Sequence, residues 1–386
     1  MKFHNRWNLG KVTILVIIAI VSCNERKEIK HPEKSNENQN ITVARRIAIE
    51  RKKDYTAVTF INPWQGADNV NMEYYLVKSG TQLPAGLDAT RVIFVPVKKI
   101  VCMSTTHVAM ISALGEENTI AGMSGTGFIY SGALKARSEE GLIKDVGYEA
   151  NLNKELILKI MPDLVMIYGI GSESSGYVGK IQELGVKVIY NADYLETDPL
   201  GKAEWIKLFG ALYCKEHMAD SIYNAEVEAY SSLKLFIAQS ITVKPKVLLG
   251  LPFKDTWFIS PGNSFISNLI TDAGGDYLWH DTESSVSMPF GLENVYLKAL
   301  NADFWLNIGT VKAKSEIPTV DQRLKELPCY KNGNLYNNNN RVTEAGGNDF
   351  WESGTVFPHL ILKDIATILH PDLFQYNGLF YYRKIN

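Results

Sequence analysis

One helical stretch in the middle of the chain limits the possible folds more than any other feature of the sequence. Residues 215–240 contain neither Gly nor Pro, the residues that most often end a helix. Apolar residues recur along them at intervals that keep one helix face apolar, at Met218, Ile222, Ala225, Ala229, Leu233 and Phe236. At 1.5 Å per residue, such a helix is on the order of 40 Å long, about the width of a domain. The sequence therefore predicts one long helix that can join two parts of the protein.

Strands and helices alternate on both sides of this stretch. Before it, we expect strands at 100–103, 119–123, 164–168 and 187–190, with helices at 106–114, 155–160 and 178–184. After it, we expect strands at 247–250 and 303–308, with helices at 264–273, 293–300 and 358–369. Such alternation is typical of layered α/β structure with parallel strands. The predicted fold is therefore α/β, with two α/β lobes joined by one long rigid helix.

The segment before Lys98 has a different pattern. Three β-rich runs, at residues 55–61, 72–78 and 92–95, indicate a small antiparallel β extension. The expected organisation is thus a β extension over 41–97, an amino-terminal α/β lobe over 98–214, a bridging helix over 215–240 and a carboxyl-terminal α/β lobe over 241–386.

The first residues indicate export from the cytoplasm. Three basic residues precede the apolar run 12–21, which is too short to span a bilayer comfortably. The following Ile20, Val21, Ser22 and Cys23 resemble the lipobox of bacterial lipoproteins, whose Cys is acylated. This resemblance implies a signal peptide over 1–22, a lipidated Cys23 and a location on the periplasmic side of the cell envelope, anchored to the membrane. A polar tether over 23–40 follows. The alternative is a signal-anchor helix with an incidental Cys.

Composition excludes several classes of protein. The chain has 386 residues, of which 21% are charged and 46% hydrophobic, and its formal net charge is −2. These values argue against a coiled coil, a disordered chain, a polytopic membrane protein and a nucleic-acid-binding surface. Apart from Cys23, the cysteines are Cys102, Cys214 and Cys329, an odd and widely spaced set that forms neither a disulfide framework nor a CxxC metal motif.

Several segments of the chain together resemble a known family. Residues 99–107, 145–147, 156–165 and 368–374 are similar to the helical-backbone (class III) substrate-binding proteins of bacterial ABC importers. Those proteins deliver iron–siderophores, haem or cobalamin to a membrane permease. The resemblance covers residues 98–374, and residues 62–66 of the extension also resemble lipoprotein members of the family. It implies a monomer without a cofactor, which holds its ligand in a cleft between two α/β lobes.

The resemblance also implies roles for individual residues. Glu155 and Glu293 match the positions at which one carboxylate per lobe docks onto permease arginines, although a Glu at a helix start is also favoured by the helix dipole. Loops that follow strands supply the candidate ligand contacts. In the first lobe these are Thr106, His107, Ser124, Tyr130, Tyr168, Ser174 and Tyr177. In the second lobe they are Phe253, Trp257, Met288, Arg341, Asn348, Asp349 and Trp351.

The predicted function is capture of an iron chelate, a ferric siderophore, and its delivery to an ABC permease. Cobalamin or haem in the same role stays open, because aromatic side chains suit all three ligands. An enzyme with Cys102, His107 and Asp145 is a weaker alternative, since Cys102 lies in an apolar strand and no GxSxG or HExxH motif occurs. A direct metal-ion site is also disfavoured, because the His residues are scattered. No catalytic residue, metal site or nucleic-acid partner is expected.

Overall fold

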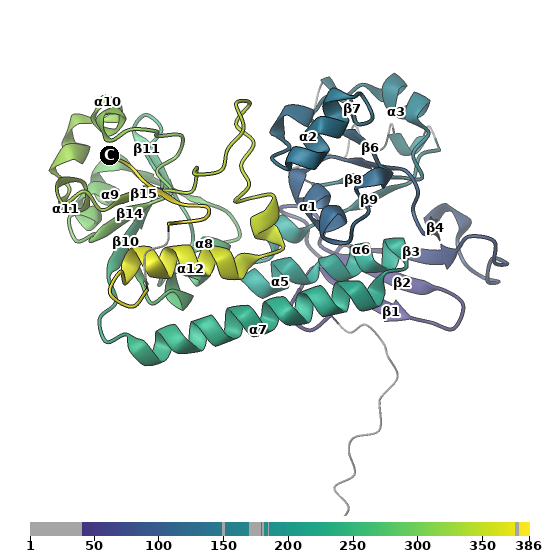
Figure 1. Ribbon diagram of the computed structural model, residues 1–386, viewed down its shortest axis with the longest axis horizontal. Coiled ribbons are helices and arrows are strands. Elements are labelled where there is room, and N and C mark those ends of the chain that lie inside the picture. The colour runs from purple at the N-terminus through teal and green to yellow at the C-terminus, as the bar shows by residue number, and fades with distance from the viewer. Residues whose placement is uncertain (1–40, 149–150, 170–178, 180, 184, 375–377) are drawn as a thin grey trace, which may run out of the picture. The chain divides into compact units, whose positions relative to one another are not determined.

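The computed structural model describes residues 41–148, 151–169, 179, 181–183, 185–374 and 378–386. In this part of the chain, two five-stranded sheets and one long helix confirm the predicted α/β fold (Figure 1). Signal peptide, Cys23 and tether fall outside the described residues. Of the predicted helix at 178–184, residues 179 and 181–183 are described, and all four are helical.

The first sheet is entirely parallel, with the strand order β7-β6-β5-β8-β9. Its strands are β5 (Ile100–Cys102), β6 (Ile120–Met123), β7 (Lys144–Asp145), β8 (Leu164–Ile167) and β9 (Val188–Tyr190). Every residue of β5, β8 and β9 is buried, as expected for parallel strands covered on both faces. The helices α1 (Thr105–Ala113), α2 (Gly132–Glu139) and α3 (Lys154–Ile160) follow β5, β6 and β7 along the chain.

The second sheet has the order β12-β10-β14-β15-β16, and its edge strand β16 is antiparallel. Its strands are β10 (Lys246–Leu249), β12 (Asp276–Tyr277), β14 (Phe304–Leu306), β15 (Leu335–Asn337) and β16 (Arg383–Lys384). A separate antiparallel pair consists of β11 (Thr256–Ile259) and β13 (Met288–Gly291). The α-helices of this lobe are α8 (Phe265–Asp272), α9 (Leu292–Ala299), α10 (Ile317–Val320), α11 (Pro328–Lys331) and α12 (Pro358–Leu369).

The long helix α7 (Glu216–Ser240) connects the two lobes, and its extent agrees with the prediction. The helices α5 (Pro199–Glu204) and α6 (Ile206–Tyr213), together with α8 and α12, pack against it (Figure 1). Near its amino terminus, Ala219 lies so close to Gly210 of α6 that a Cβ on that glycine would meet it at 2.6 Å. Near its other end, Lys234 forms an ion pair with Asp272 at 2.8 Å.

The buried face of α7 overlaps the predicted apolar face only in part. Ile222 and Leu233 of the predicted face are partly buried against the hydrophobic cores. Met218, Ala225 and Phe236 are exposed, whereas the buried residues are Ala219, Tyr223, Glu226, Tyr230 and Ile237. The polar members of this face have partners. The Tyr230 hydroxyl donates to Asp272 at 2.8 Å, and Glu226 lies 2.6 Å from Nδ1 of His359. Because hydrogen bonding removes most of the cost of burying polar groups, apolar spacing alone did not identify the face.

The amino-terminal extension forms a four-stranded sheet with the order β1-β2-β3-β4. The strands are β1 (Ile47–Arg51), which the sequence analysis missed, β2 (Thr56–Ile61), β3 (Asn71–Lys78) and β4 (Val92–Val95). The prediction of an antiparallel sheet holds for β1, β2 and β3, but β4 pairs with β3 in parallel. Phe60 of this sheet stacks on Trp205 with ring centroids 6.1 Å apart, so the extension and the first lobe share one hydrophobic core.

Two buried carboxylates fix the segment that enters the extension. Glu204, at the end of α5, accepts backbone N–H groups from Thr42, Val43 and Ala44 at 2.8–3.1 Å, and it pairs with the Lys207 ammonium at 2.7 Å. Burial by itself would raise the pKa of Glu204, but these donors hold that pKa below its ordinary value. Glu196 accepts the next two N–H groups, at 2.9–3.0 Å. The extension is therefore held to the first lobe by charge-assisted hydrogen bonds as well as by apolar packing.

We expect Glu204→Gln to destabilise the protein by about 3 kcal/mol. The amide offers one accepting oxygen in place of two, and it removes the negative charge that pairs with the buried Lys207 ammonium. Urea unfolding followed by circular dichroism measures the effect. The matched control is Glu228→Gln on the exposed side of α7, which should change the unfolding free energy by less than about 0.5 kcal/mol. Equal stabilities of the two variants would contradict this role for Glu204.

Candidate functional site

A cavity of about 760 Å³ lies where loops of the two lobes meet. One side consists of residues around the turn after β2 and residues that follow β9. The other side consists of the loops before α8 and before β13. The charged, aromatic and amide side chains in its wall include Arg46, Trp64, Gln65, Tyr194, Lys202, Phe265 and Trp351. A cavity bounded by the ends of parallel strands is where an α/β protein ordinarily holds a ligand.

Among the described residues, Lys202 is one of two cations in the wall of this cavity, and the other is Arg46. Its ammonium lies 5.3 Å from the ring centroid of Phe265 and 5.9 Å from that of Trp351, so two aromatic faces flank it. It also lies 3.8 Å from the buried carboxylate of Asp193. Burial raises the pKa of Asp193, and the nearby Lys202 opposes that rise. Trp351 is thus a predicted contact that the structure places at the cavity, next to a lysine that the sequence analysis did not select.

Thr106 does not line the cavity but contacts Asp193, the partner of Lys202. Its hydroxyl donates to the other oxygen of Asp193 at 3.4 Å, and its side chain is almost fully buried. The residue therefore orients the carboxylate that faces Lys202, and its predicted direct contact with ligand would require the surrounding side chains to move.

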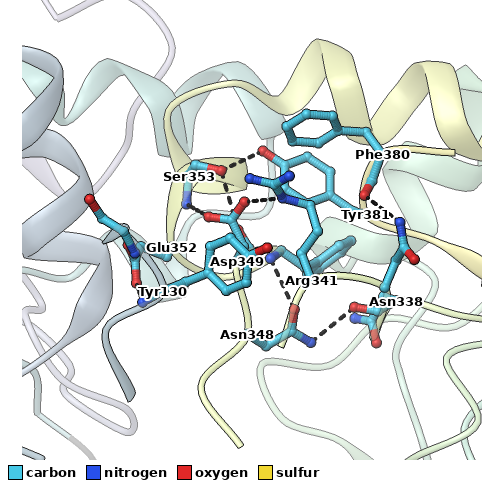
Figure 2. A network of polar contacts seen from close by, with 12 residues as sticks. Tyr130, Asn338, Arg341, Asn348, Asp349, Glu352, Ser353, Phe380 and Tyr381 are labelled. Carbon is cyan, nitrogen blue, oxygen red and sulfur yellow. Dashed lines mark hydrogen bonds and ion pairs between the residues drawn. The ribbon is translucent and has the colours of Figure 1, made fainter. Parts of the chain in front are cut away.

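Arg341, Asp349 and Tyr130 come together in a second polar cluster (Figure 2). Nε of Arg341 donates to Oδ2 of Asp349 at 2.6 Å. The Arg341 guanidinium lies 4.8 Å from the ring centroid of Tyr130 and 4.2 Å from that of Phe380. The sequence analysis predicted Arg341 as a partner for an anionic chelate. In the structure the Asp349 carboxylate already binds one edge of the guanidinium. A ligand anion would therefore have to share the guanidinium with Asp349 or displace that carboxylate.

Asn348 holds the backbone of the same loop. Its side-chain amide donates to the Asn338 carbonyl at 2.9 Å, and its side-chain oxygen accepts the N–H of Phe350 at 3.0 Å. With both ends of the amide in use, Asn348 shapes the loop that carries Arg341.

This loop, residues 338–353, reaches from the second lobe to the first. Glu352 accepts the backbone N–H groups of Tyr130 and Ser131 at 2.8 and 3.0 Å (Figure 2). The Thr343 hydroxyl donates to the Gly127 carbonyl at 2.9 Å. A Cβ on Gly347 would lie only 2.0 Å from the Phe128 carbonyl oxygen, so the two backbones are in direct contact. The lobes are therefore connected by this crossing loop as well as by α7.

Glu352 makes this connection sensitive to pH. Burial raises its pKa from 4.5 to about 7, although the two backbone donors act in the opposite direction. Because the folded-state pKa lies above the unfolded one, the protonated form stabilises the fold below about pH 4.5. That stabilisation is lost as the pH rises through about 7. The change corresponds to at most roughly 3 kcal/mol.

We expect Glu352→Gln to remove this contribution, so that the unfolding free energy declines less between pH 5 and pH 8 than in the wild type. Urea titrations at several pH values measure it. Glu344→Gln, in an exposed position of the same loop, is the control and should keep the wild-type pH dependence. If the Glu352 and Glu344 variants had the same pH profile, Glu352 would not be the titrating group.

Two predicted ligand contacts are buried in the hydrophobic cores, and their selection does not agree with this structure. His107 is fully buried on α1, and burial lowers its pKa to about 3. Trp257 is fully buried beside Trp305, with its indole N–H donating to the Leu249 carbonyl at 3.0 Å. Neither side chain presents surface to a ligand. The reason is that His107 lies on the buried side of α1 and that Trp257 packs on Trp305 of β14, which strand ends alone do not reveal.

The other predicted contacts lie in different places relative to the cavity. Ser124 is almost fully buried after β6, and Tyr168, after β8, packs edge-on against Tyr194 with ring centroids 6.4 Å apart. Phe253 is 68% exposed, and Met288 packs against the second core. Ser174 and Tyr177 lie outside the described residues. Tyr168 therefore contacts Tyr194, which lines the cavity. Phe253 and Met288 do not line the cavity.

The sequence analysis missed Trp64, Gln65, Tyr194, Lys202 and Phe265. Tyr194 follows the carboxyl end of β9 by four residues, so the rule that selected the other loop residues could have found it. The turn at 62–66 had been noted only as a resemblance. Lys202 lies inside a helix, and no local signal indicates that its ammonium faces a cavity.

Glu155 and Glu293 occupy equivalent places in the two lobes. Each lies in the first turn of a helix, α3 or α9, and each is exposed. Glu293 also lies 3.5 Å from the guanidinium of Arg323. These placements agree with a helix-start preference and leave both carboxylates accessible to a partner.

Comparison with known proteins identifies the family. Residues 100–343 match the family model described as periplasmic binding protein. The chain belongs to this family. It is 24% identical to the uncharacterized lipoprotein MJ0878 of Methanocaldococcus jannaschii, over 98% of this chain and 96% of that protein. It is 28% identical to a second uncharacterized lipoprotein of that organism, MJ0872, over 83% of this chain and 81% of the relative.

Solved structures show the same fold at low sequence identity. A possible iron-binding periplasmic solute-binding protein from Staphylococcus epidermidis has a TM-score of 0.56 and 16% identity, covering 71% of this chain and 99% of its own. A periplasmic heme-binding protein from Pseudomonas aeruginosa has a TM-score of 0.53 and 15% identity, covering 71% and 93%. A periplasmic vitamin B12-binding protein from Vibrio cholerae has a TM-score of 0.50 and 14% identity, covering 72% and 99%. The two-lobed α/β fold is thus the one used by class III substrate-binding proteins.

Two kinds of feature are absent from the described residues. Across the part of the chain that the structure describes, no helix has both the length and the apolar character needed to cross a bilayer. In the same residues, no group of three or more His, Cys, Asp or Glu side chains is arranged to hold a metal ion.

Proposed function

We propose that this protein is the substrate-binding lipoprotein of an ABC importer and that it captures an iron chelate, a ferric siderophore, in the cavity between its lobes. The cavity carries the proposal. Its volume, about 760 Å³, suits a ligand of several rings, and its wall combines aromatic faces with the Lys202 ammonium. The protein would bind and release this ligand without transforming it. Cobalamin and haem are the alternatives in the same role.

The remaining parts of the chain fit this role. Residues 1–22 would act as a signal peptide, and acylation of Cys23 would anchor the mature protein, as a monomer, to the membrane through the tether 23–40. The names of the methanogen relatives, both called lipoproteins, support this anchoring. The similar solved proteins are described as possibly iron-binding, heme-binding and vitamin B12-binding, which supports the choice of ligand classes.

Binding can be tested by tryptophan fluorescence, because Trp64 and Trp351 line the cavity. We expect saturable quenching, with a dissociation constant in the micromolar range or tighter, by at least one of a ferric siderophore, haem and cobalamin. The metal-free siderophore serves as a control for binding of the chelator alone. Free Fe³⁺ or Zn²⁺ serves as a control for direct metal binding. Binding of the free ions alone would favour a metal-ion receptor, and no binding by any probe at micromolar concentration would refute the proposal.

Docking to the permease is assigned to Glu155 and Glu293, whose exposed carboxylates can accept bidentate guanidinium groups. We expect the double variant Glu155→Lys, Glu293→Lys to bind ligand as the wild type does. Its stimulation of the ATPase of its reconstituted permease should fall at least about tenfold, because like charges would then face each other. Glu228→Lys, an exposed charge reversal on α7, is the matched control. Full stimulation by the double variant would rule out this docking role.

A further inference from the structure

We propose that the amino-terminal sheet supplies one wall of the ligand site, and that the indole of Trp64, in the turn 62–66, selects ligands with a flat ring surface. The inference rests on the proposed function, because it assigns a specificity-determining residue to the same cavity. The family match begins only at residue 100, so this wall comes from a segment outside the matched domain.

The turn that carries Trp64 is closed at its base. Between β2 and β3, the Asn62 N–H donates to the Val70 carbonyl at 2.7 Å, and the Asn62 side-chain oxygen accepts the Val70 N–H at 2.8 Å. Asn62 and Gly66 adopt positive φ values of 47° and 82°, which such a reversal needs. The loop therefore projects from the sheet as a defined turn.

The turn is joined to the parallel sheet of the first lobe, β7-β6-β5-β8-β9. Trp64 forms a parallel bridge with Gly169, two residues after the end of β8. The Gln65 N–H donates to the Gly169 carbonyl at 3.3 Å, and the Tyr194 hydroxyl donates to the same carbonyl. The Trp64 ring lies 5.3 Å from the ring of Tyr190, at the end of β9. Backbone pairing and aromatic packing thus place Trp64 at the carboxyl edge of the sheet, where the cavity lies.

Gly169 is required for this close approach. A Cβ at that position would lie 2.5 Å from the Cβ of Trp64 and 3.3 Å from the ring of Tyr190. No side chain fits there unless the turn moves away. The pair Trp64 and Gly169 therefore provides two independent ways to disturb the same wall.

The indole has surface available for a ligand. Trp64 is half-buried, because Tyr190 covers part of its ring while the residue also lines the cavity. Trp351 and Phe265 also line the cavity. Aromatic faces arranged in this way favour a planar π surface, such as a catechol ring or a macrocycle, over a wholly aliphatic chelate.

The first test is binding by Trp64→Ala, measured by equilibrium dialysis so that loss of a tryptophan does not affect the signal. The probes are haemin and a ferric tris-catecholate, which carry rings, and an aliphatic ferric trihydroxamate. We expect the affinity of Trp64→Ala for a ring-bearing probe that the wild type binds to fall about tenfold. Trp64→Phe should keep most of the wild-type affinity for that probe. The affinity of Trp64→Ala for the trihydroxamate should change little. Phe94→Ala is the control, since Phe94 is an exposed aromatic of the same sheet that does not line the cavity.

A second pair of variants separates the wall from general stability. Gly169→Ala should reproduce the loss seen in Trp64→Ala, whereas Gly132→Ala, where a Cβ meets no atom within 4 Å, should not. Thermal unfolding checks that each variant is folded. If the wild type binds a ring-bearing probe and the folded Trp64→Ala variant binds it equally well, the inference is wrong while the proposed function stands. If the wild type binds only the trihydroxamate, the inference is also wrong. If it binds none of these probes and no cobalamin, the proposed function fails and the inference fails with it.

Discussion

Buried carboxylates that accept backbone N–H groups hold this structure together outside its sheets. Asp364 of α12 accepts the N–H groups of Phe380, Tyr381 and Tyr382 at 2.6–3.0 Å, and so positions the segment that leads into β16. Glu204, Glu196 and Glu352 do the same for other irregular segments. A buried carboxylate is costly unless several donors satisfy it, and backbone donors are available only where no strand or helix uses them. Each carboxylate therefore fixes one irregular segment in one position.

These fixed segments are also the ones that build the cavity and its surroundings. Glu204 and Glu196 hold the segment that enters the extension, and the extension carries the turn with Trp64. Glu352 holds the crossing loop, which brings Trp351 to the cavity. Sheets and helices thus supply a frame of the kind shared with distant relatives, whereas the cavity wall depends on long-range hydrogen bonds.

This division explains what the sequence could predict. The extent of α7 depends on local signals, the lack of Gly and Pro and a regular spacing, so its prediction agreed with the structure. Its buried face depends on distant partners, since Tyr230 and Glu226 can be buried only because Asp272 and His359 are opposite them. Strand ends likewise indicated Tyr130 and Arg341, but they could not show that His107 points into a core or that Lys202 faces the cavity.

Charge pairing at Lys202 and Arg341 limits how these two cations can recognise a ligand. Lys202 faces Asp193, and Arg341 faces Asp349, so each positive charge already has a carboxylate partner from its own lobe. At either position, an anionic ligand must therefore share the cation with a carboxylate or displace that carboxylate. Either change lowers the net electrostatic gain of binding. The aromatic faces of Trp64, Phe265 and Trp351 need no such exchange. For the proposed ligand, ring surface would contribute to affinity without displacing a protein group, while Lys202 and Arg341 would mainly discriminate between ligands that already fit.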